Sequence, residues 1–176
     1  MGRYAEIISE GHARRWDILI LVTLGTQQFQ MNRLVEAVDK IAPQLEEEVF
    51  IQTGSSAYVP VNCRYADFVD SEKFNGMIEE CSILITHSGV GSIMSGLLKG
   101  KPVIVVPRLE KYHEHVDDHQ QQIAEAFAGK DCVLYCRDLD RLQEYIEEAK
   151  NHKFAPYIIQ GGKIEDIILD YLKIFE

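Results

Sequence analysis

The chain has 176 residues and a formal net charge of −10, with 46% hydrophobic and 26% charged residues. These values are typical of one globular domain with a sizeable core. The negative charge argues against a protein that coats nucleic acid or an anionic lipid surface by itself. A polyanionic ligand would instead need backbone amides and a few well-placed side chains.

Targeting and redox features point to the cytoplasm. No apolar run approaches the roughly 18 residues that a membrane-spanning helix needs. Charged residues at 14, 15 and 17 interrupt any signal-peptide pattern. The cysteines form no C-x-x-C pair, which favours reduced structural thiols. They are Cys63, Cys81, Cys132 and Cys136.

Beyond a polar N-terminal extension (1–16), apolar and amphipathic stretches alternate along a single domain (17–176). Strands are predicted at 17–23, 49–52, 64–69, 82–87, 102–107 and 133–135. Helices are predicted at 29–42, 71–80, from about 90, 117–128, 139–150 and 164–175. This alternation predicts an α/β fold with a single Rossmann-like, doubly wound parallel sheet. Ligands of such sheets bind beyond the carboxyl ends of the strands, so the loops there are candidate sites.

The loop that follows the strand at 82–87 carries the strongest functional signal. It reads His87-Ser88-Gly89-Val90-Gly91-Ser92 and opens a helix. Glycines allow close approach of the backbone, and the amides at a helix N-terminus favour phosphate, so a diphosphate fits this loop. The alternative is a turn that only caps the helix, with Ser92 near the cap. A dinucleotide fingerprint is weak here because Met94 occupies the third glycine position.

A second polar loop follows the strand at 102–107 and precedes the next predicted helix. Its side chains suit hydrogen bonds to ribose and sugar hydroxyls, although Asp117 or Asp118 could merely cap that helix. A metal site is disfavoured because His113-x-His115 lacks a third ligand in the correct register. The Asp138-Leu139-Asp140 sequence reads better as a helix N-cap than as a metal-binding motif.

Four segments together resemble the carboxy-terminal domain of the GT-B glycosyltransferases of family 28. The resemblance extends to its small two-subunit members of the PssE and Alg13 types. The segments are VTLGTQQF (22–29), FIQTGSS (50–56), ITHSGVGSIMSGLLKGKPVIVVPR (85–108) and EHVDDHQ (114–120). The resemblance implies the carboxy-terminal half of a GT-B fold that binds a UDP-sugar.

The resemblance also implies site residues. The His87–Ser92 loop would face the diphosphate, and His119 and Gln120 would face the donor sugar. Relatives often carry Glu where Ser95 stands, so Glu114 or a backbone group is expected to hold the ribose. The full donor-binding set is Gly25, Thr26, His87, Ser88, Gly89, Val90, Gly91, Ser92, Glu114, His115, His119 and Gln120.

The chain is long enough for one of the two domains of a GT-B enzyme. The resemblance further implies an inverting hexosyltransferase subunit that needs neither a metal nor another cofactor. Its catalytic base would lie in a membrane-anchored partner subunit of the Alg14 or PssD type, which would bind a polyprenyl-diphosphate-linked saccharide acceptor. The chain would then be cytoplasmic and peripheral at the inner face of the membrane. The alternatives are a non-catalytic, regulatory UDP-sugar-binding subunit and a standalone nucleotide-sugar epimerase or hydrolase.

Overall fold

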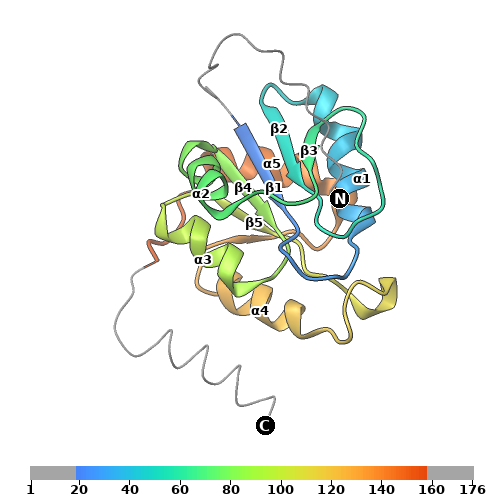
Figure 1. Cartoon of the computed structure of the whole chain (residues 1–176). Coiled ribbons are helices and arrows are strands. Elements are labelled where there is room, and N and C mark those ends of the chain that lie inside the picture. The colour runs from blue at the N-terminus through green and yellow to red at the C-terminus, as the bar shows by residue number, and fades with distance from the viewer. Residues whose placement is uncertain (1–18, 158–176) are drawn as a thin grey trace.

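A computed structural model describes residues 19–157 of the chain. The predicted N-terminal extension (1–16) and the predicted helix at 164–175 lie outside the described residues. The described part forms one six-stranded sheet with the order β3-β2-β1-β4-β5-β6, in which every pair of neighbours is parallel (Figure 1). This order is that of a doubly wound Rossmann-like sheet, so the predicted fold class is confirmed.

The strands are β1 (Leu19–Thr23), β2 (Glu48–Gln52), β3 (Arg64–Ala66), β4 (Ile83–Thr86), β5 (Val103–Val105) and β6 (Leu134–Tyr135). The α-helices are α1 (Asn32–Ile41), α2 (Ser71–Glu80), α3 (Val90–Leu98), α4 (His119–Ala128) and α5 (Leu142–Asn151). Short 3-10 turns stand at Ala42–Gln44, Glu110–Tyr112 and Leu139–Arg141. All six predicted strands form. The predicted helices within the described residues also form. Some have the predicted ends, and others begin or end at different residues.

The two helix starts that were predicted too early have a physical cause. Helix α1 begins at Asn32 rather than at Phe29, because the Asn32 amide donates to the side-chain oxygen of Gln30. Helix α4 begins at His119 rather than at Asp117, because the Asp117 carboxylate accepts from the His119 amide. In both places a polar side chain ends the preceding loop, so that loop is longer than the apolar pattern indicates.

The central strands β1 and β4 are buried on both faces, because alternate residues enter two separate cores. Ile20 and Val22 pack in the core that α1 and α5 cover. Leu19 and Leu21 pack in the core that contains residues of α2, α3 and α4. Each aliphatic side chain that is fully buried on these faces stabilises the fold by about 1.5–3 kcal/mol. The two layers fix the strand ends, and hence the loops that follow them.

Asp138 has the N-cap role that the sequence predicted. Its side chain accepts from the Asp140 amide at the start of the 3-10 turn that leads into α5. An aspartate that caps a helical segment in this way needs no metal to explain it.

Candidate functional site

The sheet has one topological switch point, at β1. Strand β1 pairs with β2 on one side and β4 on the other. The chain after β1 leads to α1 and the chain after β4 leads to α3, and these two helices pack in different cores. The loops at 24–31 and 87–89 therefore start side by side and lead to helices in different cores. In an open α/β sheet, the crevice at the carboxyl ends of the strands lies between two such loops. Open α/β sheets bind their ligands at this place.

Two glycines enclose the His87 ring in this crevice. A Cβ added at Gly25 would lie 2.5 Å from Cε1 of His87, and one added at Gly89 would meet the same ring even more closely. Gly25 also has a φ of 69°, which a residue with a Cβ rarely adopts. The loops after β1 and β4 thus meet across an imidazole that is only 5% exposed.

Burial makes His87 a neutral imidazole. Its removal from solvent, with smaller contributions from the charges of Arg108 and His115, lowers its pKa to about 4. The Thr23 carbonyl opposes this shift. Near neutral pH the ring carries one N–H and one acceptor nitrogen, so it can donate one hydrogen bond without adding charge to the site.

The N-terminus of α3 opens into the crevice. Its N-cap is Gly89, which has no capping side chain, and its first turn contains no acidic residue. Ser92 lies three residues after the N-cap, near the cap as the alternative of a helix-capping turn had it, so the choice between that turn and a ligand loop stays open. Beside this end, the Ser88 hydroxyl is fully buried and has no hydrogen-bond partner within residues 19–157. Amides at such a helix end, with a spare hydroxyl beside them, form an anion-binding arrangement.

Ser95 lies one turn further along α3. Its hydroxyl donates to the Gly91 carbonyl at 2.8 Å, within the helix. A serine bonded back to its own helix cannot span the distance that a glutamate would. This agrees with the expectation that another group takes the place of the glutamate of relatives.

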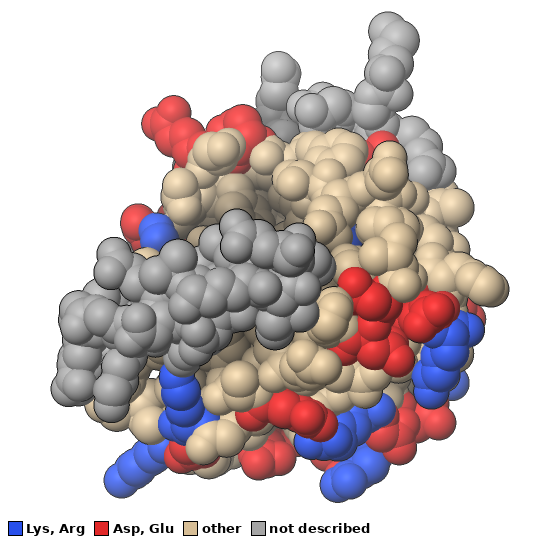
Figure 2. All heavy atoms as spheres, turned by 90° about the horizontal axis from the view of Figure 1, so that it is seen from below, with Lys and Arg blue, Asp and Glu red and all other residues tan. Residues whose placement is uncertain are grey.

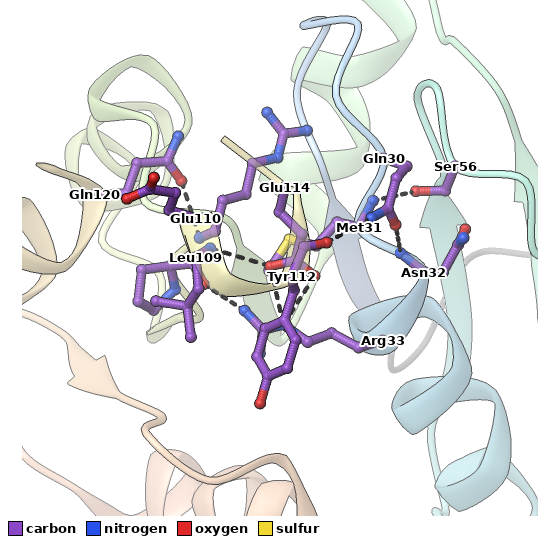
Figure 3. Close-up of polar contacts among 12 residues, drawn as sticks. Gln30, Met31, Asn32, Arg33, Ser56, Leu109, Glu110, Tyr112, Glu114 and Gln120 are labelled. Atoms are coloured by element: carbon purple, nitrogen blue, oxygen red, sulfur yellow. Dashed lines mark hydrogen bonds and ion pairs between the residues drawn. The ribbon is translucent and has the colours of Figure 1, made fainter. Parts of the chain in front are cut away.

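An ion pair joins the loop after β5 to helix α1 (Figure 3). The Arg33 Nε lies 2.8 and 2.9 Å from the two carboxylate oxygens of Glu114, and an Arg33 Nη donates to the Pro107 carbonyl. Glu114 also accepts from the Leu109 amide at 3.1 Å. The Arg33 guanidinium lies 5.0 Å from the Tyr112 ring centroid. Both oxygens of Glu114 are thus occupied, and the residue is 1% exposed.

Arg108 makes a second connection between the loops, and it is fully buried. Its guanidinium donates to the carbonyls of Leu24 and Phe29 at 2.7 and 3.2 Å, and to the side-chain oxygen of Gln27 at 3.0 Å. The Arg108 amide donates to Oε1 of Gln120, which is 5% exposed. One residue therefore holds the loop after β1, the end of β5 and the start of α4 together.

Asp117 organises the histidines of the polar loop. One of its oxygens lies 3.0 Å from Nδ1 of His115 and accepts from the His119 amide at 3.1 Å. Its other oxygen lies 3.8 Å from Nε2 of His119. The ring of His115 packs against Phe29 of the loop after β1, with 5.3 Å between the ring centroids. The structure thus brings His115 and His119 together beside the crevice.

Side chains of the loop after β2 hold the loop after β1 in place through hydrogen bonds. The Ser56 hydroxyl accepts from the Met31 amide at 2.9 Å, and the Ser55 hydroxyl donates to the Gln27 carbonyl. Thr26, an exposed residue of the predicted donor set, lies in the segment that these contacts hold.

Sequence reasoning assigned no role to Arg33 or Arg108. A detectable signal existed for Arg108, since a charge directly after a buried strand must find partners. Arg33 carried no such signal, because the distance of 81 residues to Glu114 leaves no local pattern.

Metal and thiol chemistry find little support at this site. Within residues 19–157 no group of three His, Cys, Asp or Glu side chains could hold a metal ion. Burial raises the pKa of Cys63 and of Cys136 to about 12, and that of Cys81 to about 11. Thiols with such pKa values are poor nucleophiles near neutral pH. The arrangement is instead suited to holding an anion by backbone amides.

Comparison with known proteins gives the family. The model of the glycosyltransferase family 28 C-terminal domain matches residues 19–158. The chain is similar to the UDP-N-acetylglucosamine transferase subunit ALG13 of Candida albicans, with 32% identity over 87 residues. This match covers 49% of the chain and 28% of the Candida protein. The human protein of the same name is 29% identical over 126 residues, which cover 66% of the chain and 11% of that protein.

Solved structures share the fold. The NMR solution structure of ALG13 superposes with a TM-score of 0.56 at 19% identity, over 87% of this chain and 94% of that one. The glycosyltransferase of kitacinnamycin gives a TM-score of 0.62 at 22% identity, over 86% of this chain and 39% of that one. The curated relatives are thus spanned only in part, and the structural likeness concerns the fold. The family match over residues 19–158 is sufficient to conclude that the chain belongs to the glycosyltransferase family 28 C-terminal domain family.

Proposed function

We propose that the chain is the donor-binding subunit of a UDP-sugar-dependent glycosyltransferase. In this proposal it adds a hexose to a polyprenyl-diphosphate-linked saccharide in polysaccharide biosynthesis, together with a partner subunit. Two findings support the donor class. The chain belongs to the family, and its ALG13 relatives are named as subunits of a UDP-N-acetylglucosamine transferase.

The observation that carries the proposal is the open N-terminus of α3 at the switch point. The first-turn amides have no capping side chain, no acidic residue stands among them, and the buried Ser88 hydroxyl beside them is unpartnered within residues 19–157. A diphosphate would satisfy these donors together. This arrangement favours a nucleoside diphosphate over a neutral ligand.

The reaction follows from these donors. An acceptor hydroxyl oxygen attacks the anomeric carbon of the sugar, the bond from that carbon to the diphosphate oxygen breaks, and UDP leaves with the electron pair. Amides of α3 and the N–H of the neutral His87 would stabilise the negative charge that develops on the leaving group. A base outside this site takes the acceptor proton. A single displacement of this kind inverts the anomeric configuration, and in this proposal backbone amides rather than a metal stabilise the leaving group.

The donor-binding residues fall into two groups in this proposal. Amides and side chains of the loop after β4, with Gly25 and Thr26, would contact the nucleotide diphosphate. His115, His119 and the Gln120 amide would face the sugar. Glu114 already binds Arg33 and the Leu109 amide, so we assign it the role of holding the loop rather than the ribose. The ribose would then depend on backbone groups.

A partner of the Alg14 or PssD type is also part of the proposal, with the chain peripheral at the cytoplasmic face of the membrane through it. Among residues 19–157 no helix has the length and apolarity to cross a bilayer. Val116, on the loop that follows the carboxyl end of β5, is 69% exposed and is a candidate contact. From the sequence, the apolar residues Val90 and Tyr58 are also candidate contacts near this open edge. Both are only partly exposed, and the Tyr58 hydroxyl bonds to Asp39 inside the domain.

The experiment is a donor panel assayed with and without the partner subunit, using a polyprenyl-diphosphate sugar as acceptor. Calorimetry with UDP on the folded chain and on the complex accompanies it. We expect UDP binding, transfer only with the partner present, and no effect of chelator. Failure of the intact complex to bind UDP would remove the proposal. Binding without any transfer across the panel would favour the regulatory alternative.

A further inference from the structure

Arg108 is a buried charge that the domain does not neutralise by direct contact. Its guanidinium has two backbone carbonyls and one amide oxygen as partners, all of them uncharged. Its Nε is buried and has no hydrogen-bond partner among the described residues. Burial lowers the pKa of Arg108, but a guanidinium stays protonated in proteins. A buried cation with neutral partners costs free energy unless a charge compensates it.

The nearest compensating charge is already shared. Glu114 interacts electrostatically with Arg108, yet its two oxygens bind the Arg33 guanidinium. The Arg33 Nε donates to both of these oxygens, so both oxygens act as acceptors of the same charged donor. Two guanidinium groups and one carboxylate leave this cluster with a charge of +2 − 1 = +1. One positive charge therefore remains inside the domain.

This charge lies beside the proposed diphosphate position. Arg108 donates to the carbonyl of Leu24, whose neighbour Gly25 packs against the His87 ring. That ring packs in turn against Gly89, the N-cap of α3. The charge of Arg108 also contributes to the low pKa of His87, so its field reaches this ring.

The positive charge on the described surface is unevenly spread over the face at the carboxyl ends of the strands. Figure 2 views the molecule from below, the side toward which the strands of Figure 1 run. Most Lys and Arg atoms in that view lie in its lower half, and only a small blue patch shows within the tan area near the middle. The whole chain carries a net charge of −10. A dianionic ligand would thus meet a protein whose overall field repels it.

We propose that Arg108 is the built-in counter-charge of the donor site, a positioning residue that favours the diphosphate through the buried field without touching it. This inference rests on the proposed function, since it assumes that a diphosphate binds at α3. A low-dielectric interior and the absence of bulk ions around the guanidinium make such a field effective.

The first test uses the full chain without ligand, so it does not depend on donor binding. The pKa of His87 is measured by NMR in the wild type, in Arg108→Met and in Arg108→Lys. We expect the methionine variant to raise this pKa and the lysine variant, which keeps the charge, to leave it close to the wild-type value. An unchanged pKa in Arg108→Met would overturn the inference.

The second test compares UDP with uridine by calorimetry. Loss of the charge in Arg108→Met should weaken UDP by about 10- to 100-fold, the range for losing an interaction with a charged group. Binding of uridine, which has no phosphate, should stay nearly unchanged, and Arg108→Lys should restore most of the UDP affinity. Equal losses for UDP and uridine would mean that Arg108 only supports the fold. If the wild-type protein binds no UDP while the His87 pKa responds to the Arg108 variants as expected, the proposed function fails. The electrostatic effect of Arg108 on His87 would still be established.

Gln27 supplies a variant that avoids disturbing the buried residue. It is exposed, and its side-chain oxygen accepts from Arg108. Gln27→Glu would place a carboxylate on the guanidinium and neutralise it, so it should raise the His87 pKa and weaken UDP but not uridine. Gln27→Ala removes the same hydrogen bond without adding charge and should leave the His87 pKa and the ratio of UDP to uridine affinity unchanged. If both variants behave alike, the charge of Arg108 has no part in binding.

Discussion

The loop after β4 and the loop after β5 lie at the same edge of the sheet, but they use their polar groups in opposite ways. The first is short and rich in small residues, and it leaves the start of α3 without a side-chain cap and the Ser88 hydroxyl without a partner inside the described domain. The second is long and charged, and several of its side chains bond within the domain. Unpaired donors indicate a ligand site, whereas paired ones indicate support for it.

This difference changes how polar residues near a ligand site should be interpreted. Residue type alone suggests that Glu114 and Gln120 contact the ligand as directly as Ser88 does. In the structure, Glu114 is 1% exposed and bonds to Arg33, and Gln120 is 5% exposed and bonds to the Arg108 amide. The predictions below test whether the loop after β4 binds the ligand and whether the loop after β5 holds the site in position.

The largest expected effect is on stability, from Arg33→Ala. Removing Arg33 leaves the Glu114 carboxylate buried without its counter-ion, which should cost about 3–5 kcal/mol of unfolding free energy. Urea denaturation at neutral pH measures this loss. Arg141→Ala is the control, because Arg141 pairs with Glu144 on the exposed surface, where a pair contributes about 0–1 kcal/mol.

The pH dependence of the same variant sharpens the assignment. Burial raises the pKa of Glu114, and Arg33 is the largest influence that lowers it. Without Arg33, the folded-state pKa rises further above the unfolded value, so the folded state holds its proton more tightly. Stability of the variant should then be highest below the unfolded pKa and fall as the pH rises through the folded one. If Arg33→Ala loses the same unfolding free energy relative to the wild type at acid and at neutral pH, Glu114 is not a buried, unpaired carboxylate in the variant.

Ser92→Asp tests the loop after β4 directly. Ser92 lies in the first turn of α3, where a carboxylate would occupy the amides and repel the diphosphate. We expect UDP affinity to fall by about 100-fold or more, in the range of like-charge repulsion at a desolvated site, while the fold is kept. The control is Ser71→Asp, the same change at the first position of α2. Retained UDP binding in Ser92→Asp would place the nucleotide elsewhere.

Gly91→Ala separates binding from folding. A Cβ at Gly91 meets no atom of the described chain within 4 Å, and Ala favours a helix over Gly by about 0.5–1 kcal/mol. The variant should be as stable as the wild type or slightly more so. Its UDP affinity should nevertheless fall by about tenfold, if the added methyl group enters space that the diphosphate needs. Gly76→Ala in α2 is matched in both respects and should not affect UDP.

Much of the fold follows from local patterns. Short apolar runs in the sequence predict the buried strands. The helix at 71–80 was predicted with its observed ends. The loop after β4 was predicted as a ligand site from its glycines and serines, which leave the backbone accessible, and its role stays a prediction. What the sequence could not show are pairings between distant residues. The contact of Arg33 with Glu114 spans 81 positions and that of Arg108 with Leu24 spans 84, and neither leaves a periodic signal.

Ring contacts and helix starts show the same limit. The placement of His87 between Gly25 and Gly89 depends on β1 and β4 being neighbours, which only the strand order establishes. The start of α4 depends on the Asp117 carboxylate, whose choice between a cap and a ligand contact was open in the sequence. Local chemistry therefore identifies which loops matter, and tertiary contacts decide what each side chain does.

The smallest expected effect concerns Gln120, where positioning and binding meet in one side chain. Its Oε1 accepts from the Arg108 amide, so its Nε2 is the group that would reach a sugar hydroxyl. Gln120→Ala should weaken UDP-sugar binding by about two- to tenfold relative to UDP, the worth of one neutral hydrogen bond. Gln120→Glu keeps an acceptor for the Arg108 amide and loses the donor, so it should reduce the same ratio. If the glutamate variant restores the wild-type ratio, Gln120 acts only through Arg108 and the loop after β5 has no direct contact with the sugar at this position.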